Sequence, residues 1–217
     1  MTNLFDPDYI PTLLSRIIIL VIAFSVHEFS HAFIANAFGD DTPRQNGRLT
    51  LNPAAHLDLM GSLMLLVAGF GWAKPVPINP YRLQQRSPNA VMWVSLAGPG
   101  SNLLLAVLAA IPFRLNLVTP SFTTGMLPSL YIFLLEFIVI NLSLMVFNLI
   151  PLSPLDGEKI AYRLFPVSWA NTMDRIRPYA PVILLVLVFV LPMVGVDIIG
   201  MIMRPAITNL LRLLLGV

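Results

Sequence analysis

Long apolar runs constrain the fold of this chain more than any other feature. Four stretches consist mostly of apolar residues, at 12–38, 89–112, 128–150 and 180–203. A helix rises about 1.5 Å per residue, so about 20 such residues cross the hydrocarbon core of a bilayer. Each stretch is long enough to do so. We therefore predict an all-α polytopic membrane protein, a bundle of about four to five transmembrane helices.

The composition agrees with that prediction and excludes several classes of protein. Hydrophobic residues make up 57% of the chain and charged residues 11%, whereas soluble domains carry about 25% charged residues. The net charge is only +2 and the basic residues are spread among loops, so we expect no nucleic-acid partner. The chain has no cysteine, which excludes disulfides and cysteine metal ligands. We expect residues 1–217 to form a single domain within the lipid bilayer.

The stretch at 57–72 is apolar but too short to cross a bilayer as a helix. It contains three glycines and leads into "KPVPINP", residues 74–80, whose alternating prolines exclude a helix. We predict a re-entrant segment with an extended, β-hairpin-like part.

The C-terminal part, about 178–217, is predicted to be one helix followed by a tail. The helix pattern is interrupted by Pro192 and Gly195, which leaves open whether residues 180–217 form one span or a hairpin. Residues 205–217 are predicted to be an amphipathic tail at the membrane surface.

The first apolar stretch carries "HEFSH", which contains His27, Glu28 and His31. Residues four apart on a helix lie about 40° apart around the axis and roughly 6 Å along it, so the two histidines can bind one metal ion. Glu28 can reach a metal-bound water without binding the metal. In this arrangement zinc lowers the pKa of the water and the glutamate takes its proton. Such polar groups are costly in lipid, which favours a functional site over a hydrogen-bonded packing cluster.

A catalytic zinc ion usually has three protein ligands, so a third ligand must come from elsewhere in the chain. The candidates are His56, Glu136 and Asp156. Asp156 lies in "NLIPLSPLDGEK", where prolines and a glycine break a helix and leave a carboxylate at membrane depth. For His56 we favour a substrate-side role, and for Glu136 an interhelical hydrogen bond. Asp156 is the preferred ligand.

The choice of Asp156 constrains the topology. The histidines and Asp156 meet only if the helices at 12–38 and 128–150 run parallel, which requires one spanning helix between them. This holds if 89–112 spans the membrane and 57–72 does not. That topology places nine lysines and arginines on one side and four on the other, and positive residues favour the cytoplasm. We expect a metal site nearer the cytoplasmic face.

Together these motifs resemble the site-2 proteases, a family of intramembrane zinc metalloproteases. The resemblance rests on "HEFSH", on "NLIPLSPLDG" and on their order, and it covers about residues 17–165, the predicted catalytic core. "LTLNPAAHLDLMGSL", "GWAKPVPINP" and "AGPGSN" are similar to the compact bacterial and archaeal branch, which lacks PDZ and CBS domains. The resemblance implies a multi-pass protein of a prokaryotic plasma membrane.

The resemblance also implies a role for each site residue. His27, His31 and Asp156 would bind one Zn2+ per chain, and Glu28 would be the general base. Asn148 would help to position the substrate or its scissile carbonyl.

Several other polar and small residues have simpler expected roles. Asn102, a buried amide in the second long helix, is expected to contact the site or the substrate. Asn102 and His56 are both expected to support the substrate or the transition state. Gly98 and Gly100 are expected to allow close helix packing. Asn141 is expected to form an interhelical hydrogen bond.

The function that the resemblance implies is hydrolysis of peptide bonds within or near transmembrane segments of other membrane proteins. Those substrates and the lipid bilayer would be the partners, while the substrate's identity and the oligomeric state stay open. Two alternatives are a catalytically silent metal-binding membrane protein and a metal transporter. A transporter predicts ionisable residues at several depths, whereas here they cluster at one depth. The intact Glu28 favours a protease over a silent protein.

Overall fold

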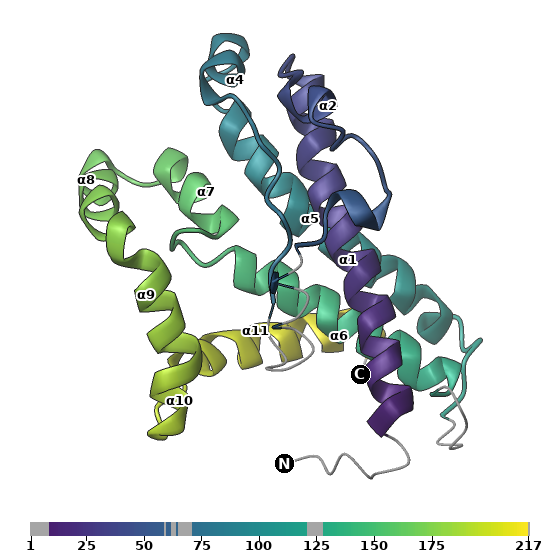
Figure 1. Ribbon diagram of the computed structural model, residues 1–217. Coiled ribbons are helices and arrows are strands. Elements are labelled where there is room, and N and C mark those ends of the chain that lie inside the picture. Colours follow the sequence, from purple (N-terminus) through teal and green to yellow (C-terminus); the bar gives the residue numbers. More distant parts are fainter. Residues whose placement is uncertain (1–8, 59, 62–63, 65–70, 121–127, 217) are drawn as a thin grey trace.

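In the computed structural model, every regular element among the described residues is a helix (Figure 1). The described residues are 9–58, 60–61, 64, 71–120 and 128–216. Five helical segments are long and apolar enough to cross a membrane: Pro11–Ala37, Ala90–Arg114, Leu130–Asn148, Val167–Met193 and Ile198–Leu215. The predicted all-α membrane fold is confirmed.

The first long helix leads to a group of short elements at one end of the molecule. α1 (Tyr9–Ala37) is followed by α2 (Thr42–Gln45), and α4 (Pro80–Arg86) lies at the same end (Figure 1). The buried Asp40 connects them, because its Oδ2 accepts a hydrogen bond of 2.6 Å from the main-chain N–H of Asn79, directly before α4. This bond fixes the start of α4 beside the end of α1.

Between α2 and α4 the described chain is mostly irregular. After η1 (Pro53–Ala55), Leu57 and Ala73 form a single antiparallel β-bridge. Residues 74–79 are non-helical, as their prolines predict. In the described part the predicted β-hairpin is thus reduced to this bridge. Most of the predicted re-entrant segment, at 59, 62–63 and 65–70, lies outside the described residues.

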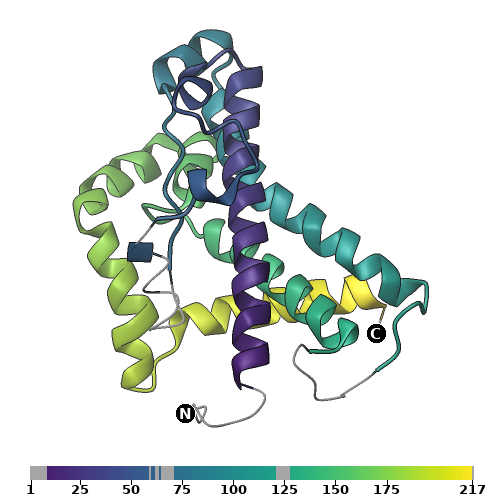
Figure 2. The same ribbon diagram turned by 45° about the vertical axis from the view of Figure 1, so that its right-hand side comes forward.

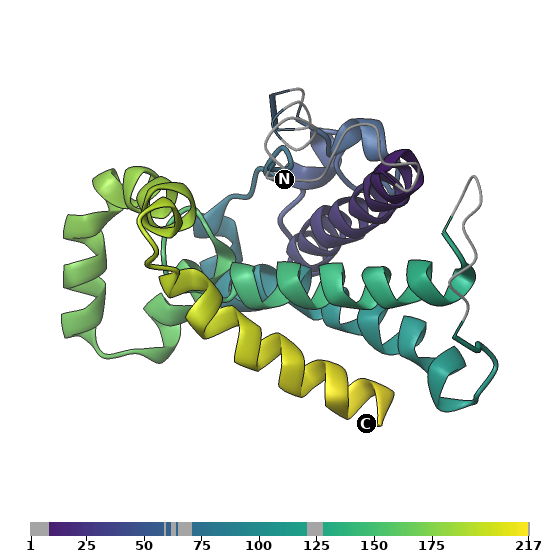
Figure 3. The ribbon, with the colours of Figure 1, turned by 90° about the horizontal axis from the view of Figure 1, so that it is seen from below.

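The apolar core lies where α5 (Ala90–Arg114) passes between α1 and α6 (Leu130–Asn148). Small residues of α5 meet larger residues of α6, and such small residues let helices approach closely in a membrane. The buried members of this cluster are Ala106, Ala109, Ala110, Ile138, Leu142 and Met145. α11 (Ile198–Leu215) packs alongside the same cluster (Figure 3).

After α6 the chain continues as an arm of short helices that stands beside the core (Figures 1 and 2). Its elements are α7 (Asp156–Leu164), α8 (Val167–Ile176), η2 (Arg177–Tyr179), α9 (Ala180–Leu185), the π-helical turn η3 (Val186–Val190) and α10 (Leu191–Met193).

The C-terminal part differs from the prediction of one helix over 180–203. The helix stops before Gly195, which has a φ of +86°, and the Asp197 carboxylate then caps the start of α11. Glycine adopts this left-handed conformation without a steric penalty, so the chain reverses here. Two helices therefore replace one, and the tail predicted at 205–217 forms the second half of α11.

Candidate metal centre

Two imidazoles meet on one face of α1. His27 and His31 lie in its later half, with ring centroids 4.7 Å apart and ring planes at 82°. Their spacing of four residues places both on the same side of the helix. The two residues are only 5% and 8% exposed. The structure therefore brings this pair together in the protein interior, as the sequence predicts.

Asp156, the first residue of α7, completes a group of three. Its Oδ2 lies 3.2 Å from His27 Nε2 and 3.1 Å from His31 Nε2. One potential ligand atom from each residue lies within 4.8 Å of the other two. Asp156 Oδ2 thus lies where it and both imidazoles could bind one metal ion.

The turn between α6 and α7 sets the position of Asp156. Gly157 packs so closely on the end of α6 that an added Cβ would lie 2.4 Å from the carbonyl oxygens of Leu149 and Ile150. No side chain fits there without a shift of the backbone. A glycine at this position therefore allows α7 to start beside the end of α6.

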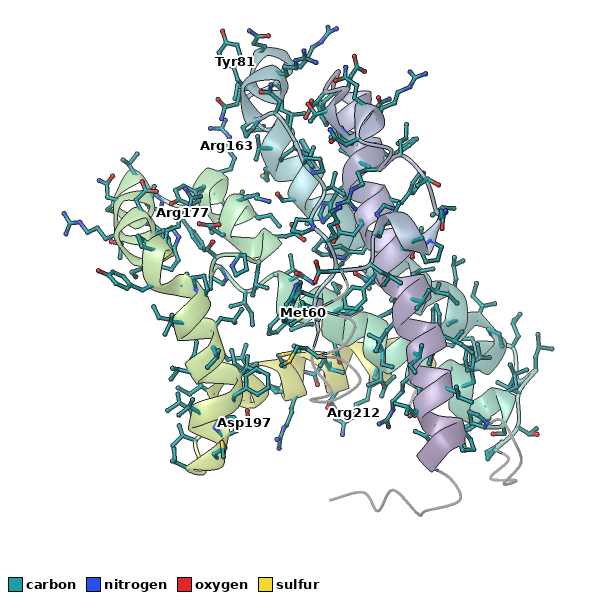
Figure 4. All side chains as sticks on the ribbon, in the orientation of Figure 1. Met60, Tyr81, Arg163, Arg177, Asp197 and Arg212 are labelled. Atoms are coloured by element: carbon teal, nitrogen blue, oxygen red, sulfur yellow. The ribbon has the colours of Figure 1, made fainter. Side chains whose placement is uncertain are left out.

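Charged side chains of the arm hold α7 from its other sides (Figure 4). Arg163 donates to the Asn89 side chain, directly before α5. The buried Glu158 pairs with Arg177 at 2.8 Å. These contacts tie α7 to α5 and to η2, and so stabilise the element that carries the carboxylate.

Gly98 of α5 faces the two imidazoles. An added Cβ there would lie 2.4 Å from His31 Nε2 and 2.5 Å from His27 Nε2. Glycine at position 98 therefore keeps any side chain away from the two nitrogens that could bind an ion. Two imidazoles and one carboxylate are also a typical donor set for zinc. The residues present therefore fit a zinc ion.

The other nitrogen of each imidazole is held by α5. His31 Nδ1 lies 2.6 Å from the main-chain oxygen of Val94, and His27 Nδ1 lies 2.6 Å from Asn102 Oδ1. Metal-binding histidines almost always donate their second N–H to an oxygen in this way, which orients the ring. Asn102 is fully buried and contacts the site through His27, one of the two roles that the sequence predicts for it. Asn102 Nδ2 donates in turn to Asn141 Oδ1 of α6, at 2.9 Å.

Sequence reasoning missed the contact of Gly98 with the site and the link from Asn141 to it. Both had been assigned to helix packing alone, and Asn141 does form the predicted interhelical bond. One signal was available: Val94, Gly98 and Asn102 recur every four residues and so form one stripe on α5. That stripe faces the histidines of α1.

The remaining candidates lie elsewhere. Glu136 pairs with Arg16 of α1 at 2.9 Å, so the predicted interhelical bond is confirmed and Glu136 is not part of the group. His56 is fully buried, and its Nε2 lies 2.7 Å from the Thr50 carbonyl oxygen, within its own loop. Asn148 donates to the Leu144 carbonyl of its own helix at 2.9 Å, and its substrate role stays a prediction.

Known proteins that are similar to the chain include zinc metalloproteases by name. The Bacillus subtilis (strain 168) protein named "Putative zinc metalloprotease YwhC" is 42% identical over 82% of this chain and 80% of its own length. A protein named "Putative zinc metalloprotease Rip2" from Mycolicibacterium smegmatis is 41% identical over 42% of this chain and 39% of its own length. Its namesake from Mycobacterium tuberculosis (strain H37Rv) is 31% identical over 77% of this chain and 63% of its own length.

No family model and no solved structure matches the chain. The relatives are named for zinc, the ion that the group of His27, His31 and Asp156 fits. The Bacillus relative is matched over most of both chains. The chain is therefore a zinc metalloprotease that belongs to the site-2 protease family.

Proposed function

We propose that this metalloprotease hydrolyses peptide bonds within or near transmembrane segments of other membrane proteins. The observation that carries the proposal is the place of the three-residue group. Its two histidines belong to a helix that is long and apolar enough to span a membrane, and all three residues are at most 9% exposed. A protease whose metal ligands lie at membrane depth acts on segments that reach that depth.

In this proposal His27, His31 and Asp156 would hold one zinc ion. A bound zinc ion lowers the pKa of water and polarises a carbonyl group. Glu28 follows His27 on α1, is 9% exposed and is not part of the three-residue group. It would accept the proton of the attacking water and pass it to the leaving amide nitrogen.

The substrate must expose a peptide carbonyl, which an intact helix keeps in its internal hydrogen bonds. A locally unwound segment can pair with an extended edge of the enzyme, as in β-augmentation. Residues 74–79 are non-helical and follow the bridge between Leu57 and Ala73. We assign the presentation of the substrate to this segment.

The test uses Glu28→Gln in lipid vesicles, with tagged single-span peptides as substrates. We expect near wild-type zinc content and a loss of cleavage of at least about 100-fold, because a general base contributes roughly that much. Glu136→Gln is the matched control: it makes the same change in a second intramembrane glutamate, and cleavage should continue. Cleavage by Glu28→Gln at the wild-type rate would overturn the assignment of the base. If the wild-type enzyme cleaved soluble peptides but not the single-span peptides, the proposed intramembrane action would be wrong.

A further inference from the structure

A continuous chain of hydrogen bonds runs from the main chain of α6 to His27. Asn141 Nδ2 lies 2.9 Å from the carbonyl oxygen of Phe137, and Asn102 Nδ2 lies 2.9 Å from Asn141 Oδ1. Asn102 Oδ1 then lies 2.6 Å from His27 Nδ1. Both asparagines are fully buried, so water cannot replace any of these partners.

The hydrogen bond from Asn141 to the Phe137 carbonyl fixes which groups donate and which accept in the whole series. A carbonyl oxygen only accepts, so the group that Asn141 turns toward Phe137 is its NH2, and its oxygen faces Asn102. The oxygen of Asn141 also only accepts, so Asn102 turns its NH2 to Asn141 and its oxygen to His27. His27 must therefore donate through Nδ1–H. In the neutral ring this leaves the lone pair on Nε2, the nitrogen beside Asp156.

We propose that Asn141 and Asn102 are positioning residues that hold His27 in the tautomer able to bind zinc through Nε2. The inference deepens the proposed function, since it takes His27 as a metal ligand. Asn141 does not touch His27 and acts only by fixing which end of the Asn102 amide faces it. The second histidine is held differently, because the acceptor for His31 Nδ1 is the main-chain oxygen of Val94. A main-chain carbonyl cannot turn over, whereas a side-chain amide can.

The hydrogen bonds that link Asn141 to Asn102 and Asn102 to His27 are called the relay below. Replacing the Asn141 amide by an apolar group would change the direction of these bonds. In Asn141→Leu the Asn102 NH2 loses its acceptor, and the amide can turn by 180°. Its NH2 would then face Nδ1 of His27 and favour the tautomer with the proton on Nε2. That tautomer has no lone pair for the metal. In Asn141→Asp the buried neutral carboxylic acid can donate its O–H to the Phe137 carbonyl and still accept from Asn102, so the direction of these hydrogen bonds is preserved.

The first measurement is the tautomer itself, in zinc-free protein labelled with 15N-histidine in lipid nanodiscs at a pH where the rings are neutral. Every sample carries Asp156→Ala, because the Asp156 carboxylate lies 3.2 Å from His27 Nε2 and would otherwise attract the proton there. The chain has only three histidines, so His56→Gln and His31→Gln assign the signals. We expect His27 to carry its proton on Nδ1 in Asp156→Ala alone and together with Asn141→Asp, and largely on Nε2 together with Asn141→Leu. A proton on Nε2 of His27 in Asp156→Ala alone would overturn the proposal, whatever the other variants do.

The second measurement is zinc affinity, determined by competition with a chelator. Loss of an outer partner of a metal ligand typically weakens binding about 10- to 100-fold, so we expect a weakening in that range for Asn141→Leu and recovery in Asn141→Asp. Ser143→Ala is the matched control, because the Ser143 hydroxyl also donates to its own helix, to Val139 O at 2.8 Å. Its zinc affinity should equal that of the wild type.

Asp156→Ala separates failure of the relay from failure of the proposed ligand set. If Asp156→Ala loses zinc while Asn141→Leu keeps wild-type affinity and does not change the tautomer, the ligand set stands and the relay is wrong. If Asp156→Ala binds zinc like the wild type, the proposed ligand set fails first, and the relay loses its premise.

Discussion

At the scale of single residues, the metal centre depends most sharply on the absence of a side chain at Gly98. In Gly98→Ala the added methyl group would lie 2.4–2.5 Å from the two imidazole Nε2 atoms. Either α5 moves away or the two imidazoles shift. We expect zinc per chain to fall at least about tenfold while the helix content by circular dichroism is unchanged. Gly100→Ala, with nothing within 4 Å of the added methyl, should keep its zinc, and equal zinc in both variants would contradict this role of Gly98.

The residues of the site differ in how far the sequence alone predicts them. His27 and His31 are set by the period of one helix, which a sequence shows directly. Asp156 needed an argument about topology, because it lies 125 residues beyond His31 and the contact depends on how helices are ordered. The roles of Gly98 and Asn141 follow only from α5 packing between α1 and α6. No local pattern specifies that packing, so the sequence predicts small and polar contacts there without their partners.

At the scale of elements, the junction of α6 and α7 decides where the carboxylate lies. In Gly157→Ala the added methyl would meet the Leu149 and Ile150 carbonyl oxygens at 2.4 Å, so the start of α7 must shift, at about 1–3 kcal/mol for overpacking. Asp156 would move with it. We expect weaker zinc binding by chelator competition and a lower midpoint of thermal unfolding. Wild-type zinc affinity in this variant would mean that the position of α7 is not what holds Asp156 in place.

The hydrophobic pattern of the sequence predicts where the long helices lie, but not every break between them. The long helices α1, α5 and α6 match the apolar stretches that predict them, since hydrophobicity alone sets their length. The sequence marks a possible break at Pro192 and Gly195 but leaves open whether the chain makes one span or a hairpin, because apolar residues continue on both sides. Gly195 and the capping Asp197 divide that run in two. These are local conformational effects that a hydropathy average does not resolve.

At the scale of the whole molecule, both ends of α11 lie at the side opposite α2 and α4. Its start follows α10, which points away from that end (Figures 1 and 2). Its last turn is held by Arg114, the final residue of α5, whose Nε donates to the Leu214 carbonyl at 2.7 Å. α5 starts beside α4, so its final residue lies at its far end. Arg212 is exposed on α11 (Figure 4). We therefore predict that α11 lies along the membrane surface, although its length and composition would allow a span.

This arrangement predicts the result of cysteine labelling in oriented membranes. The chain has no native cysteine, so Gln45→Cys, Gln85→Cys, Val196→Cys and Asn209→Cys each carry one reactive thiol. We expect an impermeant reagent to label positions 45 and 85 from the cytoplasmic side, where nine of the thirteen basic residues would lie. Positions 196 and 209 should be labelled from the other side. Opposite sides for 45 and 85 would overturn the topology, whereas no labelling of position 209 from either side would show that α11 enters the membrane.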